Sequence, residues 1–252
     1  MQFFLKKEPL SEILLCLSIF YVDHTKSKEA WVAEYTKQGI PSSFRKEPTR
    51  VVAEFIIWLE NKNQQGGLAA DLGCGLGRNS FYLASKGFSV IGLDFLQENV
   101  KAVNEQARLL NLSVQALTQD VSEVWPIEPH SLDIAIDIFC YKHIVNKQAQ
   151  KNYRQQLWQC LKPTGFYLIS LASLNDGFYG PLLLDSPSPA DKLIVDPYAN
   201  IPSYLYSLTE LSEEFSDLFI LVEASEQASS SPMHGKEYAR KVLNCIFQKR
   251  DF

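Results

Sequence analysis

The stretch LAADLGCGLGRNSFYLASKGFSVIGLDF, residues 68–95, places three glycines at alternate positions between a short apolar run and a helix-like run. The glycines are Gly73, Gly75 and Gly77, and a second apolar run ends at Asp94. Glycine permits positive φ and lets a ligand approach the backbone because it has no Cβ. The N–H groups at the start of the following helix are also free to bind. The stretch therefore predicts a strand, a ligand-binding turn, a helix and a second strand.

The same alternation continues along the chain. Helix-like patterns at 97–111 and 146–161 stand among apolar runs at 114–120, 132–139 and 165–172. Repeats of strand, helix and strand predict parallel strands joined by crossover helices, so the expected fold class is α/β with a doubly wound, mostly parallel sheet. The sequence SLTE (207–210) predicts a capping box that opens another helix. Apolar runs at 218–225 and 241–248 follow without a helix-length pattern between them, and they predict a C-terminal antiparallel strand pair.

Two regions depart from this rhythm. Residues 1–66 precede the first sheet strand and are expected to form a mainly helical cap segment, with the main domain at 67–252. Within that domain, residues 173–206 contain five prolines and five Tyr or Phe residues, and show no period. Such a long stretch without a period is typical of functional loops. We expect it to be an insert or lid, with Gly177 and Gly180 as flexible points.

Composition narrows the function classes. The 252 residues are 46% hydrophobic and 21% charged, with a net charge of −5 and no Lys/Arg block, so no nucleic-acid partner is expected. The five cysteines are widely spaced without a CxxC pair, which predicts free thiols in a reducing compartment and no metal site. The apolar run at 13–22 is too short to span a bilayer and no cleavage site follows it, so we read it as a packed helix or strand. We expect a cytoplasmic protein without a membrane partner.

The ligand class follows from the residues around the glycines. The dinucleotide pattern GxGxxG, counted from Gly73, requires glycine at position 78, where Arg78 stands. Acids instead end three successive strands, at Asp71, Asp94 and Asp120. Carboxylates accept hydrogen bonds from ribose hydroxyls, and they repel a pyrophosphate. The pattern favours a nucleoside that carries an ammonium group.

At this point the sequence resembles a known family. ADLGCGLGRNSFYLASKGFSVIGLD (70–94) is similar to the first two motifs of the class I S-adenosylmethionine-dependent methyltransferases. The resemblance continues through TQD (118–120), LDIAIDIFCYKHI (132–144) and LWQCLKPTGFYLIS (157–170), with Thr164 where the family often has glycine. Within the family it is nearest to the small-molecule, tellurite-resistance-like branch, and MHGKEYAR (233–240) resembles a His/Arg-bearing segment near that branch's active site.

The resemblance implies S-adenosylmethionine as the methyl donor, S-adenosylhomocysteine as the product, and a small-molecule acceptor. The donor-binding residues that it implies are Asp71, Gly73, Gly75, Gly77, Asp94, Phe95, Asp120, Val121 and Ile138. Tyr35 and Arg45, from the N-terminal segment, are expected to hold the donor carboxylate. The acceptor is expected to contact Phe139, Phe178, Tyr179 and Arg240.

Two histidines are candidate general bases, His143 and His234, because only histidine titrates near neutrality without a large perturbation. Methyl transfer does not always require a base, so positioning and desolvation alone remain open. Two other functions also remain open: a donor-binding protein without catalysis, and a dinucleotide-dependent oxidoreductase, which Arg78 argues against.

Overall fold

The computed structural model describes residues 24–186 and 189–251. The apolar run at 13–22 lies outside these ranges. None of the helices in the described ranges is long and apolar enough to cross a membrane.

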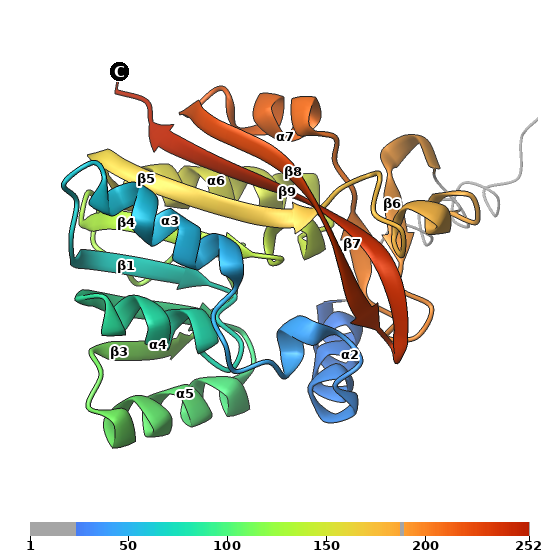
Figure 1. Cartoon of the computed structure of the whole chain (residues 1–252), viewed down its shortest axis with the longest axis horizontal. Helices are drawn as coiled ribbons and strands as arrows, with labels where there is room; N and C mark the ends of the chain where they lie inside the picture. Colours follow the sequence, from blue (N-terminus) through green and yellow to red (C-terminus); the bar gives the residue numbers. More distant parts are fainter. Residues whose placement is uncertain (1–23, 187–188, 252) are drawn as a thin grey trace, which may run out of the picture.

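A seven-stranded sheet forms the centre of the molecule, in the order β3-β2-β1-β4-β5-β9-β8 (Figure 1). The strands are β1 (Gly67–Leu72), β2 (Phe88–Asp94), β3 (Val114–Thr118), β4 (Leu132–Ile138), β5 (Leu161–Ala172), β8 (Phe219–Met233) and β9 (Lys236–Lys249). The strands from β1 to β5 pair in parallel, whereas β9 is antiparallel to both β5 and β8. The predicted fold class is confirmed, including the C-terminal strand pair.

Helices cover both faces of the sheet, and each face has its own apolar core. On one face lie α3 (Arg50–Glu60), α4 (Arg78–Ser85) and α5 (Gln97–Leu110); on the other lie α6 (Lys147–Cys160) and α7 (Leu208–Phe215). The predicted capping box opens α7: Ser207 and Glu210 exchange hydrogen bonds between side chain and backbone. Alternate strand residues face opposite cores, as at Ala69 and Ala70 of β1.

The β8–β9 hairpin extends well beyond the predicted apolar runs. The polar sequence SEQASSSP (225–232) continues β8 as a two-stranded ribbon, which turns at His234 and Gly235, with φ of 48° and 79°. Positive φ at two central residues matches the twist of a tight hairpin. The tip of the ribbon reaches past the carboxyl ends of the parallel strands (Figure 1).

The N-terminal segment divides into two parts. Helix α3 packs on the sheet, whereas α2 (His24–Lys37) lies beyond the strand ends, near the hairpin tip (Figure 1). A short 3₁₀ turn, η1 (Pro41–Ser43), follows α2, and the backbone N–H of His234 donates to the carbonyl of Gly39 at 2.8 Å. In the described residues, the part that lies over the strand ends is therefore α2 with η1.

The insert at 173–206 is folded, with short elements that its sequence did not predict. It contains η3 (Gly180–Leu183), η4 (Pro189–Asp191) and a two-stranded antiparallel sheet of β6 (Leu193–Val195) and β7 (Pro202–Tyr204). The expected flexible points are closely packed: a Cβ at Gly177 would collide with the carbonyl of Ala239, and one at Gly180 with that of Leu174. Close backbone packing therefore explains why both positions are glycine, and their flexibility stays a prediction.

Candidate active site

A cavity of about 640 Å³ lies at the carboxyl ends of the parallel strands. One wall consists of residues 73–76, 94–96, 118–123 and 138–140, which end or follow β1, β2, β3 and β4. The opposite wall comes from α2 and from the turn after it, through Trp31, Tyr35 and Arg45 among others. In open α/β sheets, ligands bind at this edge.

The glycine turn adopts the conformation that only glycine accepts readily. The φ angles of Gly73, Gly75 and Gly77 are 73°, 54° and 78°. A Cβ on Gly75 would collide with the hydroxyl of Tyr35, and a Cβ on Gly73 with the side chain of Cys140. Gly73 and Gly75 line the cavity, whereas Gly77 is the N-cap of α4 and is not among the lining residues. The glycine turn thus brings α2, the ends of the strands and the first turn of α4 close together.

Asp94 connects the first two loops. Its carboxylate accepts hydrogen bonds from the backbone N–H groups of Gly75 and Leu96, both at 2.8 Å, and it lines the cavity. Burial raises its pKa. Phe95 lies beside it on the cavity wall. The sequence placed both residues at a donor site, and the structure brings them to the cavity.

The other two strand-end acids differ from each other. Asp71 does not line the cavity: its carboxylate accepts a hydrogen bond from Ser80 Oγ at 2.6 Å and attaches α4 to β1, while burial raises its pKa to about 6. Asp120 does line the cavity, next to Val121, and accepts hydrogen bonds from the N–H and hydroxyl of Ser122 at 2.8 and 2.6 Å. Asp71 therefore acts on the shape of the turn, and Asp120 faces the cavity.

Several cavity residues were not assigned to the site from the sequence, and Trp31 and Arg78 are two of them. Trp31 stands one helical turn before Tyr35 on α2, with ring centroids 6.2 Å apart, and this i, i+4 aromatic pair was the available signal. Arg78, used only as an argument against a dinucleotide, is the first residue of α4 and lines the cavity, and burial lowers its pKa. Arg45 also lines the cavity and donates to Ser231 at 3.4 Å.

The exit from β4 is shaped by a buried carboxylate that the sequence analysis missed. Asp137 is fully buried and accepts hydrogen bonds from the N–H groups of Cys140 and Tyr141 and from the hydroxyl of Tyr153, at 2.8, 2.9 and 2.7 Å. Burial raises its pKa to about 7. Phe139 has a φ of 68°, an uncommon value for a residue with a side chain. This strained exit brings the lining residues Ile138 and Phe139 to the cavity.

His143 follows in the 3₁₀ turn η2 (Tyr141–His143) and also lines the cavity. Its Nδ1 lies 2.8 Å from the carbonyl oxygen of Pro202 in the insert, and its ring makes a T-shaped contact with that of Trp31, with centroids 5.0 Å apart and an interplanar angle of 86°. Burial, together with the charge of Lys142, lowers the pKa of His143 well below its usual value. The imidazole is therefore neutral at pH 7.

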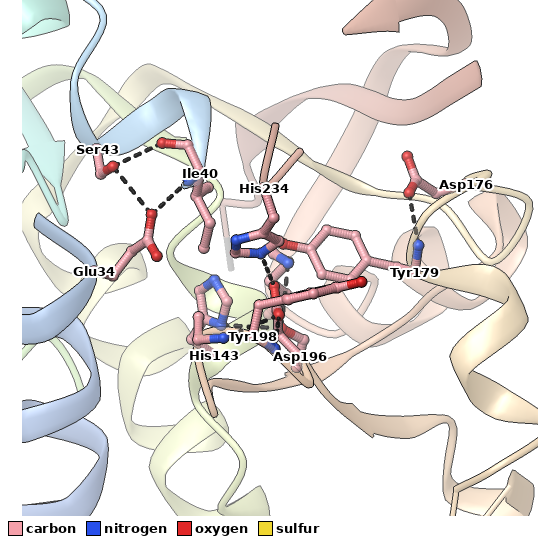
Figure 2. Close-up of polar contacts among 12 residues, drawn as sticks. Glu34, Ile40, Ser43, His143, Asp176, Tyr179, Asp196, Tyr198 and His234 are labelled. Carbon is pink, nitrogen blue, oxygen red and sulfur yellow. Dashed lines mark hydrogen bonds and ion pairs between the residues drawn. The ribbon is translucent and has the colours of Figure 1, made fainter. Parts of the chain in front are cut away.

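The remaining predicted side chains lie elsewhere. His234, Phe178, Tyr179 and Arg240 are not among the residues that line the cavity; they form a buried cluster between the insert and the hairpin, in which Figure 2 shows Tyr179 and His234. His234 Nε2 lies 2.8 Å from Asp196, and Arg240 Nε donates to Asp176 at 2.7 Å. Asp176 and Asp196 are buried carboxylates, and each needs a charged or hydrogen-bonding partner. Both pairs are therefore explained without a bound ligand. The structure places these four side chains outside the cavity lining, and their contact with the acceptor stays a prediction.

The cavity suits a nucleoside that carries an amino acid and a sulfonium. Carboxylates at the ends of two neighbouring strands match hydroxyl and amine donors, and guanidinium groups match a carboxylate. The aromatic rings of Trp31, Tyr35 and Phe139 favour a cation. Together with the sheet, these features define the class of S-adenosylmethionine-dependent methyltransferases, which take S-adenosylmethionine as methyl donor.

Comparison with known proteins gives the same class. Residues 69–165 match the family model described as "Methyltransferase domain", so the chain contains a domain of this family. It is 29% identical over 100 residues to the ubiquinone biosynthesis O-methyltransferase of Rickettsia akari, with 40% of this chain and 38% of the relative covered. It is 26% identical over 112 residues to the probable S-adenosyl-L-methionine-dependent methyltransferase TehB of Haemophilus influenzae, with 44% and 38% covered. The matches thus span well under half of these curated relatives.

Among solved structures, the chain is similar to the 1,6-didemethyltoxoflavin-N1-methyltransferase of Burkholderia thailandensis, solved with 1,6-didemethyltoxoflavin and S-adenosylhomocysteine bound. The TM-score is 0.60 and the identity is 19%, with 99% of this chain and 94% of that chain covered. At this identity the likeness concerns the fold. The family assignment from the sequence, including its similarity to the TehB branch, is confirmed by the family model and the curated relative.

Proposed function

We propose that the chain transfers a methyl group from S-adenosylmethionine to a small-molecule acceptor by in-line displacement. The observation that carries this proposal is one cavity with two unlike walls. The strand-end wall offers carboxylates, a glycine turn and Phe139, with His143 in the turn after β4, and the opposite wall offers Trp31, Tyr35 and Arg45. A volume of about 640 Å³ is within the usual range for small-molecule sites and supports a small acceptor.

The donor-binding assignments are part of the proposal. Asp94 and Asp120 bind the nucleoside part, the backbone of Gly73 and Gly75 binds the amino-acid part, and Arg45 pairs with the donor carboxylate. When bound, the donor supplies a methyl group that its sulfonium charge has already activated. The protein's own contribution is orientation and exclusion of water.

We assign the base to His143 and not to His234. His143 is neutral and lines the cavity, whereas His234 is paired with Asp196 in the buried cluster. A hydroxyl or N–H acceptor loses its proton to His143 Nε2, and the acceptor's lone pair forms the new bond to the methyl carbon. The electron pair of the broken carbon–sulfur bond stays on sulfur.

The partners and location belong to the same proposal. A small-molecule acceptor is supported by the solved neighbour, which binds 1,6-didemethyltoxoflavin. A cytoplasmic location is supported by the free thiols Cys74, Cys140, Cys160 and Cys245 among the described residues. The net charge of −5 supports the expectation that no nucleic acid is bound.

Calorimetry followed by an acceptor screen tests the proposal. S-adenosylmethionine and S-adenosylhomocysteine are expected to bind the full chain, and NAD is not. Transfer of a labelled methyl group is then measured against a panel of hydroxylated and N–H-bearing ring compounds. Donor binding with no transfer to any of them would favour a donor-binding protein without catalysis, and preferential NAD binding would contradict the proposal.

A further inference from the structure

The insert provides the partner of His143 Nδ1, through a backbone carbonyl and not a carboxylate. The carbonyl oxygen of Pro202 lies 2.8 Å from Nδ1, and the hydroxyl oxygen of Ser203 lies 3.1 Å from it. Both residues are in β7 and are buried. A residue from a distant part of the sequence therefore contacts the far side of the ring that lines the cavity.

These contacts determine where the imidazole proton is. A carbonyl oxygen can only accept, so the atom that faces it at 2.8 Å must donate. Nδ1 therefore carries the proton, and Nε2 of the neutral ring has a free lone pair. The other tautomer would place two lone pairs against each other. Among the described residues, Nε2 has no hydrogen-bond partner, and the ring borders the cavity.

Ser203 is itself held by a buried lysine. Lys142 Nζ donates to Ser203 Oγ at 3.2 Å and lies 3.9 Å from the ring centroid of Tyr179. The lysine is 1% exposed, and burial lowers its pKa to about 7. With Lys142 Nζ as one donor, the hydroxyl oxygen of Ser203 accepts, and its second lone pair is available to the Nδ1–H of His143.

We propose that β7 of the insert positions the base: the Pro202 carbonyl and the Ser203 hydroxyl fix His143 as the Nδ1–H tautomer, with Nε2 presented to the acceptor. Ser203 and Lys142 are then positioning residues, since neither lines the cavity. This inference rests on the proposed function, because it concerns the base of that reaction. It also gives the insert a catalytic role that does not require Phe178 or Tyr179 to touch the acceptor.

The charged groups around His143 set the direction of its titration. Lys142, on the same turn, disfavours the imidazolium, and α2 presents the uncharged Trp31. Farther out, Arg240, Asp176 and Asp196 act on Lys142 from β9 and the insert. Removal of the Lys142 charge therefore favours protonated His143, and the acidic limb of the rate profile is expected to move to higher pH.

The tautomer is measured directly by long-range ¹H–¹⁵N correlation on the full chain labelled at histidine, with His143→Gln used to assign the signal. The parent protein is expected to show the Nδ1–H tautomer and no titration of His143 between pH 6 and 8. In Ser203→Ala, where the Pro202 carbonyl still faces Nδ1, we expect the Nδ1–H tautomer to persist with a shifted Nδ1 resonance, and in Lys142→Met a titration midpoint at higher pH. An Nε2–H tautomer in the parent, or spectra unchanged in both variants, would overturn the proposal.

Kinetics provide the second readout. Ser203→Ala is expected to lower kcat by about tenfold with an unchanged KM for the donor, since misorientation of a base affects the chemical step. Ser203→Thr, which restores a hydroxyl, is expected to recover part of the loss. A kcat for Ser203→Ala equal to that of the parent would contradict a positioning role.

The matched control is Lys147→Met. Lys147 also lies over a tyrosine of the insert, with Nζ 4.2 Å from the Tyr204 ring, but it is exposed and contacts neither Ser203 nor His143. The Lys147→Met substitution is expected to leave the tautomer of His143, its titration midpoint and kcat unchanged. Calorimetry with S-adenosylhomocysteine separates the two hypotheses. If the parent chain does not bind this product, the proposed function is wrong, whereas the tautomer of His143 tests the positioning role by itself.

Discussion

At the scale of single residues, the cavity depends on groups that accept hydrogen bonds from the backbone and border the cavity at the same time. Asp94 is the clearest example, because its carboxylate caps two loop N–H groups and borders the cavity. Asp94→Ala is expected to weaken S-adenosylhomocysteine binding by about 1–3 kcal/mol and to lower the free energy of unfolding by a similar amount, since two buried N–H groups lose their acceptor. Calorimetry and urea unfolding measure the two effects.

Asp133 provides the control for this substitution. Its carboxylate also accepts a backbone N–H, from Leu68 at 2.8 Å, but at the opposite end of the sheet, where it pairs with Lys162 at 2.7 Å. Asp133→Ala is expected to lower stability while donor affinity stays at the parent value. Equal affinity in Asp94→Ala and the parent would show that Asp94 does not contact the donor.

Gly75 tests whether the glycine turn is limited by conformation or by contact. Its φ of 54° strains any other residue, and a Cβ would meet the Tyr35 hydroxyl. Gly75→Ala is expected to lower donor affinity by about tenfold or more. If the collision with the Tyr35 hydroxyl contributes to this loss, the double variant Gly75→Ala/Tyr35→Phe is expected to bind the donor more tightly than the sum of the two single losses predicts. Strictly additive losses would assign the whole effect to backbone strain.

At the scale of elements, the sequence predicted those parts whose apolar residues repeat with a clear period. The five parallel strands and α4 to α6 are of this kind, whereas the start of α7 was predicted from its capping-box sequence. The polar half of β8 was missed because its residues gain strand structure from pairing with β9 and not from burial. The sheet of β6 and β7 was missed for a related reason: each strand has three residues, too few for a period.

The site was predictable to the same extent. Residues that follow strand ends, such as Asp94, Phe95 and Ile138, were found because strand ends meet at one edge of the sheet. Residues whose position depends on tertiary packing were not: the i, i+4 spacing of Trp31 and Tyr35 did not reveal that this face of α2 closes the cavity. For His143, the turn after β4 was foreseen, but its contact with β7 was not.

The exit from β4 gives a prediction about stability and pH. The pKa of Asp137 is about 7 in the folded protein and near its usual value of about 4 when unfolded, so between these values the folded state binds more protons. Its contribution to stability therefore falls as pH rises from about 4 to 7, by about 4 kcal/mol. Asp137→Asn keeps the size of the side chain and removes this titration, so the difference in unfolding free energy, variant minus parent, is expected to increase over that range, although one oxygen that accepts hydrogen bonds is lost at every pH.

Urea unfolding of both proteins at intervals between pH 4.5 and 8 measures this difference. An asparagine substitution at the exposed Asp185 controls for the chemical change alone. A difference between parent and Asp137→Asn that stays constant across the range would mean that the Asp137 carboxyl has the same pKa in both states.

At the scale of the whole molecule, three segments that are distant in sequence meet over the strand ends: α2 with η1, the insert and the hairpin tip (Figure 1). Glu34 of α2 accepts hydrogen bonds from the N–H of Ile40 and the hydroxyl of Ser43, and so closes the turn that leads out of the helix (Figure 2). The hairpin then binds this turn through the His234 N–H and the Gly39 carbonyl. Of the three segments, α2 is the one that contributes several residues to the cavity wall.

This arrangement predicts where ligand binding reduces motion. Because α2 borders the donor directly and the insert reaches the cavity through His143, S-adenosylhomocysteine is expected to slow amide exchange most in residues 27–37 and less in residues 173–206. Trp31→Ala, which removes the contact between α2 and His143, is expected to reduce the protection of α2 while the core strands exchange as in the parent. Hydrogen exchange followed by mass spectrometry resolves both segments in one experiment. If the product protected the insert strongly and left α2 unchanged, the insert and not α2 would be the element that closes over the donor.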